Sequence, residues 1–153
     1  MWKQLINAFA LLAVLTLLTG FLYPLLITAL AQTLMPFQAN GSIAVKDGNP
    51  AGSLLIGQQF SSPAYFRGRP SAAGAGYDGT LSGGSNLGPT NKKLIANAAG
   101  NLRQVRAENG LSATEEVPAD LVLASASGLD PDISPAAAYL QAGRVAAARR
   151  LDA

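Results

Sequence analysis

The first third of the chain is dominated by one apolar run. No charged side chain occurs from Gln4 to Val45, and residues 5–35 read LINAFALLAVLTLLTGFLYPLLITALAQTLM. A helix needs about 20 apolar residues to cross a bilayer, and it satisfies its own backbone hydrogen bonds in lipid. The pattern therefore predicts a transmembrane helix over residues 5–35. Because Pro24 removes one backbone hydrogen bond, we expect a bend between Gly20 and Pro24.

A cleaved signal peptide is the alternative interpretation of this run, because Ala29-Leu30-Ala31 has the small-x-small pattern of a cleavage site. The apolar core of a signal peptide spans only about 7–15 residues, so the longer run favours a retained anchor. Lys3 precedes the run, and no further base occurs before Lys46. The positive-inside rule then places residues 1–4 in the cytoplasm and residues 36–153 outside.

Two small residues lie one helical turn apart within the run. Thr16 and Gly20 would share one face of the helix, and such faces let membrane helices approach closely. Thr can also donate a hydrogen bond across the contact. The pair predicts an interface with a partner membrane protein, although Thr and Gly are common enough in spanning helices for the spacing to arise by chance.

The segment after the membrane run is rich in glycine and proline, which is typical of loops. Short strands are predicted at Ile43 to Val45 and at Ser53 to Gly57, where apolar residues are bounded by glycines. The stretch from Gly74 to Gly88 has too many glycines for a regular helix. The pattern leaves open whether this stretch is an ordered or a flexible loop.

Helical spacing returns in the second half of the chain. A helix is predicted from a Thr90 cap to Glu108, ended by Asn109-Gly110. Leu121 to Leu123 reads as a buried strand, and Ser134-Pro135 begins a second, Ala-rich helix. The whole predicts a small α/β or α+β domain with a thin core. The core face of the first helix would carry Leu94, Ile95, Ala98, Leu102 and Val105.

Composition excludes several kinds of chemistry. The chain has no His and no Cys, which removes an imidazole base, a thiolate nucleophile and the usual zinc ligands. A net charge of +2 is too small for a clustered nucleic-acid footprint, so no nucleic-acid partner is expected. Asp120, Asp130 and Asp132 could bind a cation or act as acids, but turn and helix lead-in roles are favoured.

The strongest candidate for ligand chemistry is Ser82-Gly83-Gly84-Ser85-Asn86. Consecutive glycines let backbone N–H groups converge on an anion, and Ser and Asn add donors, as a phosphate cradle requires. The segment loosely resembles the signature loop of ABC-type ATPases. A tight turn stabilised by these side chains is the alternative, and this composition favours the turn.

Five ordered blocks resemble one known family over nearly the whole chain. They are Ala39–Ser42 (ANGS), Leu55–Phe60 (LIGQQF), Tyr65–Ser71 (YFRGRPS), Ser82–Pro89 (SGGSNLGP) and Ala124–Pro131 (ASASGLDP). In this order they closely resemble the C subunit of the Kdp-type potassium-transporting P-type ATPase. The resemblance implies an accessory, non-pumping and non-catalytic subunit of a high-affinity, ATP-driven potassium uptake complex in the bacterial inner membrane. Its partners would be a channel-like A subunit, an ATP-hydrolysing B subunit and a small F subunit.

The resemblance also implies candidate contacts. The family's C subunit has been described as a catalytic chaperone that raises the pump's affinity for ATP, and the matching positions are Gln58 and Ser82, Gly83, Gly84, Ser85 and Asn86. ATP would then be met through the complex and not held as a firm cofactor. The predicted topology opposes this role, because it puts these residues outside while ATP is inside. We expect docking instead, through Thr16 and Gly20 in the membrane and through Tyr65, Phe66, Arg67 and Arg69 outside.

One departure from the family affects the expected domain. Family members usually continue with a further helix and an apolar strand, whereas this chain stops at Ala153. We therefore expect a truncated chain or an incomplete domain, with a sheet edge or a core face uncovered. Two other function classes stay open: a membrane-tethered external binding module unrelated to transport, and an ATP-binding regulator that faces the cytoplasm.

Overall fold

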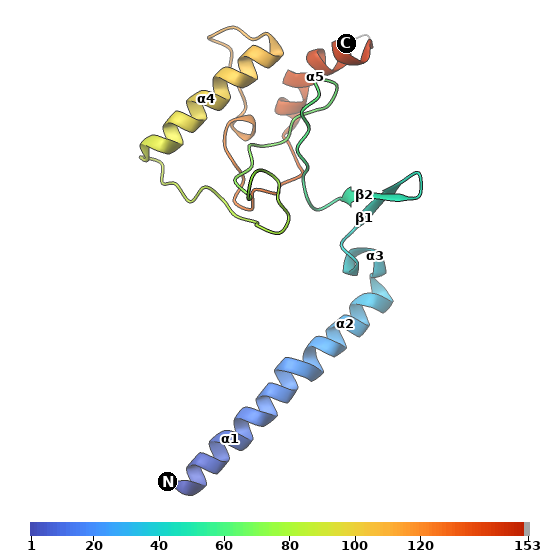
Figure 1. Ribbon diagram of the computed structural model, residues 1–153, viewed down its shortest axis with the longest axis vertical. Helices are drawn as coiled ribbons and strands as arrows, with labels where there is room; N and C mark the ends of the chain where they lie inside the picture. The colour runs from blue at the N-terminus through green and yellow to red at the C-terminus, as the bar shows by residue number, and fades with distance from the viewer. Residues whose placement is uncertain (152–153) are drawn as a thin grey trace. The chain divides into compact units, whose positions relative to one another are not determined.

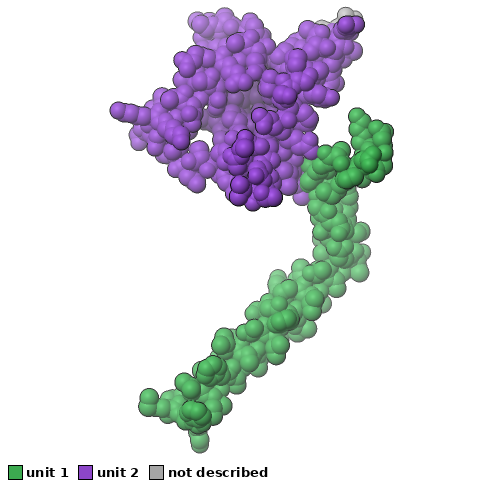
Figure 2. Space-filling view, viewed as in Figure 1, with its two compact units in different colours: residues 1–53 green, residues 54–153 purple. Residues whose placement is uncertain are grey.

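The computed structural model describes residues 1–151 and separates into two compact units (Figure 2). Unit 1 comprises Met1–Ser53 and unit 2 comprises Leu54–Ala153, described as far as Leu151. Unit 1 holds the apolar run and a β-hairpin. Unit 2 holds two longer helices, a single helical turn and the glycine-rich loops.

Unit 1 begins with one continuous helical rod (Figure 1). It consists of α1 (Trp2–Leu17), the π-helical turn η1 (Leu18–Leu22) and α2 (Tyr23–Leu34). The rod from Trp2 to Leu34 is 33 residues long with a mean hydropathy of 2.3, and its most apolar stretch has no residue buried in the protein. The predicted apolar helix is confirmed, three residues earlier at its start and one at its end.

The helix widens next to Pro24. The backbone N–H of Tyr23 donates to Leu18 O, five residues back, where a regular α-helix would pair residues four apart. Proline lacks an N–H and crowds the preceding turn, and a wider turn relieves this crowding without breaking the rod. The bend predicted between Gly20 and Pro24 stays a prediction, and the structure has a π-turn in this part of the rod.

A short helical turn, α3 (Pro36–Ala39), leads from the rod into an antiparallel hairpin of β1 (Ile43–Lys46) and β2 (Asn49–Ser53). The connecting residues Asp47 and Gly48 have φ of 52° and 79°, the left-handed pair that a two-residue hairpin turn needs. The predicted strand at Ile43 to Val45 is confirmed. The predicted strand from Ser53 to Gly57 is wrong, because the tight turn sets a register in which Ser53 already pairs with Ile43.

Unit 2 is built around α4 (Lys92–Asn109) and α5 (Pro135–Arg149). The Asn91 side chain caps α4 by accepting from the Lys93 N–H at 2.8 Å, so the helix begins one residue later than a Thr90 cap would allow. Gly110 ends α4 with a φ of 66°, as predicted. Ser134 caps α5 by accepting from the Ala137 N–H at 3.1 Å, which confirms the predicted start.

Two predictions for unit 2 are wrong. The predicted strand at Leu121 to Leu123 is instead a 3₁₀ turn, η2 (Ala119–Leu121). No strand lies beside it in the described part of unit 2, and the Asn101 side-chain amide donates a hydrogen bond to Val122 O at 2.8 Å. Ile95, expected on the core face of α4, is 57% exposed, whereas the other four residues of that predicted face are partly covered.

The apolar core of unit 2 is thin, as expected. Among the described residues of this unit, the buried apolar side chains are Ala73, Leu121, Leu129, Ala137 and Val145. These are mostly small, so they contribute little hydrophobic free energy. Gln141, 1% exposed, occupies the middle of the buried face of α5. Polar contacts must therefore supply much of the cohesion of this unit.

Candidate functional site

A cavity of about 260 Å³ lies inside unit 2, between α4, α5 and the loop that carries the YFRGRPS block. Its lining is mainly polar. Amide side chains come from the loop at Gln58 and Gln59, from α4 and from α5 at Gln141. The charged residues of the lining are Arg67, Arg69 and Glu108.

Arg67 joins the loop to α4. Its guanidinium donates to Phe60 O at 3.1 Å and to Ser61 O at 3.2 Å. Its Nε lies 2.7 Å from a Glu108 carboxylate oxygen, an ion pair in which the N–H is poorly aligned for a hydrogen bond. The side chain thus folds its own loop back and fastens it to the neighbouring helix.

Gln141 fastens the same residue to α5. Its amide oxygen accepts the Arg67 backbone N–H at 2.8 Å, and its amide nitrogen donates to Arg67 O at 3.2 Å. Arg144 donates to the Gln141 oxygen at 2.7 Å and to Asn109 Oδ1 at 3.0 Å. Burial lowers the pKa of Arg144, as does the positive charge of Arg67, while Glu108 acts in the opposite direction. This network supplements the thin apolar core of unit 2.

Arg69 connects the loop to the segment that precedes α5. It pairs with Asp130 at 3.1 Å and donates to Ala124 O at 3.3 Å. The Tyr77 hydroxyl donates to the Arg69 carbonyl at 2.7 Å. Burial raises the pKa of Tyr77, the Asp130 charge raises it further, and Arg69 partly offsets both.

The aromatic residues beside these arginines are partly open to solvent. Tyr65 is 48% exposed and Phe66 41% exposed. The Tyr65 ring packs against Phe60 with centroids 5.3 Å apart, and the Arg149 guanidinium lies 5.5 Å above it. The structure thus places the four predicted docking residues on one loop, with the aromatic rings exposed and the arginines engaged within the domain.

The glycine-rich candidate lies elsewhere in unit 2. The Gly83 N–H donates to Ser127 O at 2.8 Å, and Ser82 Oγ donates to the same oxygen at 3.1 Å. A Cβ on Gly84 would lie 2.8 Å from the Ala126 carbonyl oxygen. Close packing against this neighbouring segment therefore explains Gly84, and its bond to Ser127 leaves Gly83 no N–H for an anion. Gln58 lines the cavity, but Ser82, Gly83, Gly84, Ser85 and Asn86 do not.

The predicted structural roles of two aspartates are confirmed. Asp120 accepts the Ser134 backbone N–H at 2.7 Å and so supports the start of α5. Asp130 accepts from Arg69 and from the Asp132 N–H at 3.1 Å. Both carboxylates hold loop ends in place.

The small-residue pair in the rod keeps its predicted geometry. A Cβ built on Gly20 would lie 3.9 Å from the Thr16 methyl, so both residues share one face. The other threonines of the rod donate to carbonyls of their own helix, as Thr19 does to Leu15 O at 2.7 Å. The Thr16 hydroxyl makes no such bond among residues 1–151.

The network residues Glu108, Gln141 and Arg144 were not among the sequence candidates. One signal for Gln141 was present, since it follows Ala137 by four residues and precedes Val145 by four on the buried stripe of α5. An amide within an apolar stripe needs internal partners. No comparable signal marked Glu108, because its partner is 41 positions away in sequence at Arg67.

The fold first defines a class: a protein with one candidate membrane span near its N-terminus and a small mixed domain of helices and strands. Residues 5–153 match the family described as K+-transporting ATPase, c chain, and the chain belongs to that family. This confirms the resemblance seen in the five sequence blocks. It makes the chain a membrane-associated subunit of a potassium-transporting ATPase.

Three relatives illustrate the match, and each is named as a potassium-transporting ATPase KdpC subunit. The Gemmatimonas aurantiaca protein is 55% identical over 154 residues, covering 100% of this chain and 76% of the relative. The Mycobacterium tuberculosis protein is 50% identical over 151 residues, covering 99% and 80%. The Acidobacterium capsulatum protein is 58% identical over 132 residues, covering 86% and 69%.

Proposed function

We propose that this chain is a non-pumping accessory subunit that stabilises a high-affinity, ATP-driven potassium uptake complex. The observation that carries the proposal is the single rod from Trp2 to Leu34 without any charged residue from Gln4 onwards. A pathway for a cation needs several helices or loops that line it with oxygen ligands or ionisable groups. One helix without a charge beyond Lys3 offers neither, so we assign the pathway to other subunits.

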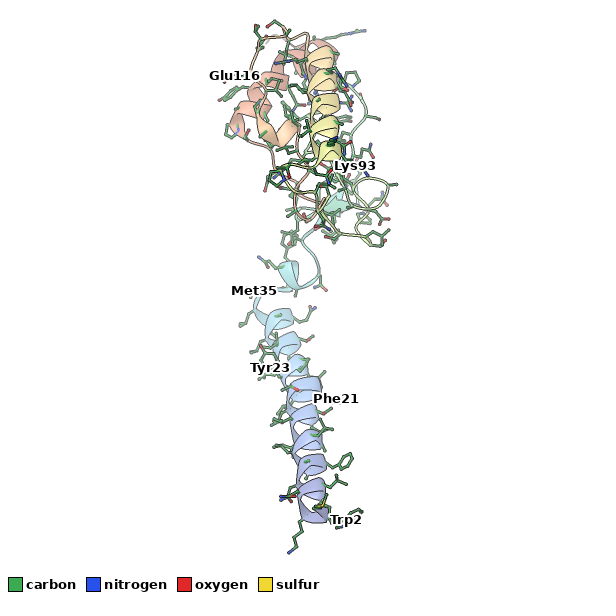
Figure 3. The ribbon with its side chains drawn as sticks, turned by 90° about the vertical axis from the view of Figure 1, so that its left-hand side faces the viewer. Trp2, Phe21, Tyr23, Met35, Lys93 and Glu116 are labelled. Atoms are coloured by element: carbon green, nitrogen blue, oxygen red, sulfur yellow. The ribbon has the colours of Figure 1, made fainter. Side chains whose placement is uncertain are left out.

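The proposed partners are a channel-like A subunit, an ATP-hydrolysing B subunit and a small F subunit. We place residues 1–4 in the cytoplasm and residues 36–153 outside, because Lys3 is the base nearest the start of the rod. Trp2 at one end of the rod and Met35 at the other mark its limits (Figure 3). Protease added to sealed inside-out vesicles should leave unit 2 intact, and rapid cleavage of unit 2 there would overturn the orientation.

Within the membrane, the Thr16 and Gly20 face is the proposed contact with a partner helix. The Thr16 hydroxyl makes no hydrogen bond inside its own helix, so it can donate one to a carbonyl of a neighbouring helix. The glycine lets that neighbouring helix approach closely. Gly20→Leu should therefore reduce co-purification of the chain with the complex. Ala10→Leu, a matched enlargement on a different face of α1, should not.

Outside the membrane, we propose that unit 2 docks over the external mouth of the channel-like subunit. Tyr65 and Phe66 would be the anchors, because half-exposed aromatic rings held on a fixed loop contribute strongly to interfaces. Arg67 and Arg69 would take part mainly by holding that loop in shape through Glu108 and the segment before α5. Co-purification with a large potassium-transport complex distinguishes this role from a free binding module.

A catalytic-chaperone role that raises ATP affinity is the second candidate function. The observation in its favour is that Gln58, one of the implied nucleotide contacts, lines the 260 Å³ cavity. The segment from Ser82 to Asn86 does not line that cavity, and its Gly83 N–H already donates to Ser127 O. The ATP concentration for half-maximal hydrolysis by the whole complex provides the test. A direct contact predicts that Gln58→Ala raises it, and no change would count against the role.

A further inference from the structure

The β-hairpin of unit 1 has one apolar face that the described part of the unit leaves uncovered. Ile43 and Val45 lie on the same side of β1, because side chains alternate along a strand and the register shift between Ala44 and Val45 skips a residue of β2, Ala51, and none of β1. They are 41% and 65% exposed, and the register partner of Val45 is Pro50. Lys46 lies on the opposite side, paired with Asn49. An isolated two-stranded hairpin is only marginally stable in water, so this face needs support.

Hydrogen bonds tie the hairpin to the end of the rod. Gln32 in α2 and Asn40 exchange side-chain amide bonds at 3.1 and 3.3 Å, and Asn40 also donates to Pro36 O at 2.6 Å. The Ser42 N–H donates to Phe37 O at 3.0 Å, and Ser42 is 5% exposed. Ser53 at the end of β2 donates to Gly41 O at 2.7 Å. The hairpin therefore cannot move far from the end of α2.

The length of the rod fixes the level at which the hairpin starts. At about 1.5 Å per residue, the 33 residues from Trp2 to Leu34 extend about 50 Å. A bilayer with its headgroups is about 40–45 Å thick, and a modest tilt absorbs the difference. Leu34 thus ends at the outer edge of the headgroups, with the hairpin a few residues further on.

We propose that the Ile43 and Val45 face of the hairpin rests on the lipid headgroup region, so that the membrane itself covers it. Charge favours lipid as the occupant, because Lys46 is the first Lys, Arg, Asp or Glu after the rod and lies on the face that would point to water. Continuity favours it too, since Met35 and Phe37 in the connection are 55% and 50% exposed and extend the apolar surface. The inference rests on the membrane span and not on the transport role.

Tryptophan fluorescence in proteoliposomes tests the proposal with the full chain. Trp2→Phe removes the single native Trp, and Val45→Trp or Lys46→Trp then places a reporter on one face or the other. The vesicles contain phosphatidylcholine brominated near the headgroup. We expect Val45→Trp to emit at shorter wavelength and to lose about half its intensity or more, as an interfacial Trp would. Lys46→Trp should emit as in water and stay unquenched.

Each other outcome overturns the proposal. Equal, water-like emission from both reporters would place the hairpin in solvent. A blue-shifted but unquenched Val45→Trp would mean that protein, from unit 2 or a second copy, covers the face. Because a single Trp could disturb the hairpin, Ile43→Trp repeats the measurement on the same face, and lipid quenching absent from both variants refutes the inference.

Discussion

The two units of this chain use opposite means to hold their shape. The rod of unit 1 exposes nearly all of its apolar side chains and depends on its own backbone hydrogen bonds. Unit 2 has a small apolar core, and long polar side chains such as Arg67, Gln141 and Arg144 join its segments. An exposed leucine therefore has a different meaning in each unit: in the rod it is what a candidate membrane span requires, whereas in unit 2 it faces water or a partner.

The largest expected effect comes from placing a charge in the rod. Leu15→Asp should weaken membrane insertion by about 3 kcal/mol, because a carboxylate near the middle of a spanning helix loses its hydration. Tyr139→Asp is the matched change in unit 2, where the side chain is 81% exposed, and it should leave insertion unchanged. Resistance to alkaline extraction from membranes measures both. Similar behaviour of the two variants would contradict the distinction between lipid and water.

Next in size is the loss of the buried amide of unit 2. Gln141→Leu should lower the free energy of unfolding by about 2 kcal/mol, since the Arg67 N–H and the Arg144 guanidinium would each lose a buried partner. Gln104→Leu on α4 provides the control, because its bond to Glu108 is exposed. Thermal unfolding of the full chain in detergent measures both. An unchanged melting temperature for Gln141→Leu would show that the apolar core suffices.

Substitutions in the loop from Tyr65 to Arg69 are expected to weaken binding to the other subunits by at least about 1 kcal/mol. Phe66→Ala with Arg67→Ala should weaken the complex by this amount, and a smaller loss would count against docking. Because Arg67 also stabilises unit 2, Tyr65→Ala with Phe66→Ala tests the exposed rings alone. Titration of the remaining subunits with each variant gives the affinity, and Tyr139→Ala serves as the control.

The smallest effect concerns alkaline pH. The pKa of Tyr77 is raised above its ordinary value of 10.0, so the folded state keeps a proton that the unfolded state releases. Stability from this group is complete below pH 10 and falls as the pH rises from there through the folded-state pKa. Tyr77→Phe should flatten this part of the stability profile, while losing some stability at neutral pH with the bond to Arg69. Parallel profiles for both proteins above pH 10 would refute the assignment.

Local signals in the sequence predicted helix ends better than strands. Gly110 and Ser134 end and begin their helices by interactions within a few residues, and both were predicted correctly. The prediction of a strand at Leu121 to Leu123 was wrong because a strand needs a partner strand. The Asn101 side chain donates to the Val122 carbonyl instead. The exposure of Ile95 was missed for a similar reason. Hydrophobic periodicity identifies the apolar face of a helix, but it does not show how much of that face a neighbouring segment covers.

In the candidate site, too, the sequence identified local motifs but not the contacts between distant residues. The YFRGRPS block was recognisable as a motif, but its arginines looked like external contacts. Only the folded chain brings Glu108 to Arg67 and Asp130 to Arg69. The glycines of the Ser82 to Asn86 segment suggested an anion cradle, whereas in the structure Gly84 packs closely against Ala126 and the Gly83 N–H donates to Ser127 O.

By itself, the sequence determined the long apolar helix, the family and two of the helix ends, at Gly110 and Ser134. These depend on the length of an apolar run, on ordered blocks of residues and on hydrogen bonds between near neighbours. The tertiary structure alone decided that Gln141 is buried and that the loop arginines are paired internally. Those features depend on residues far apart in the chain, whose meeting is set by packing and not by local preference.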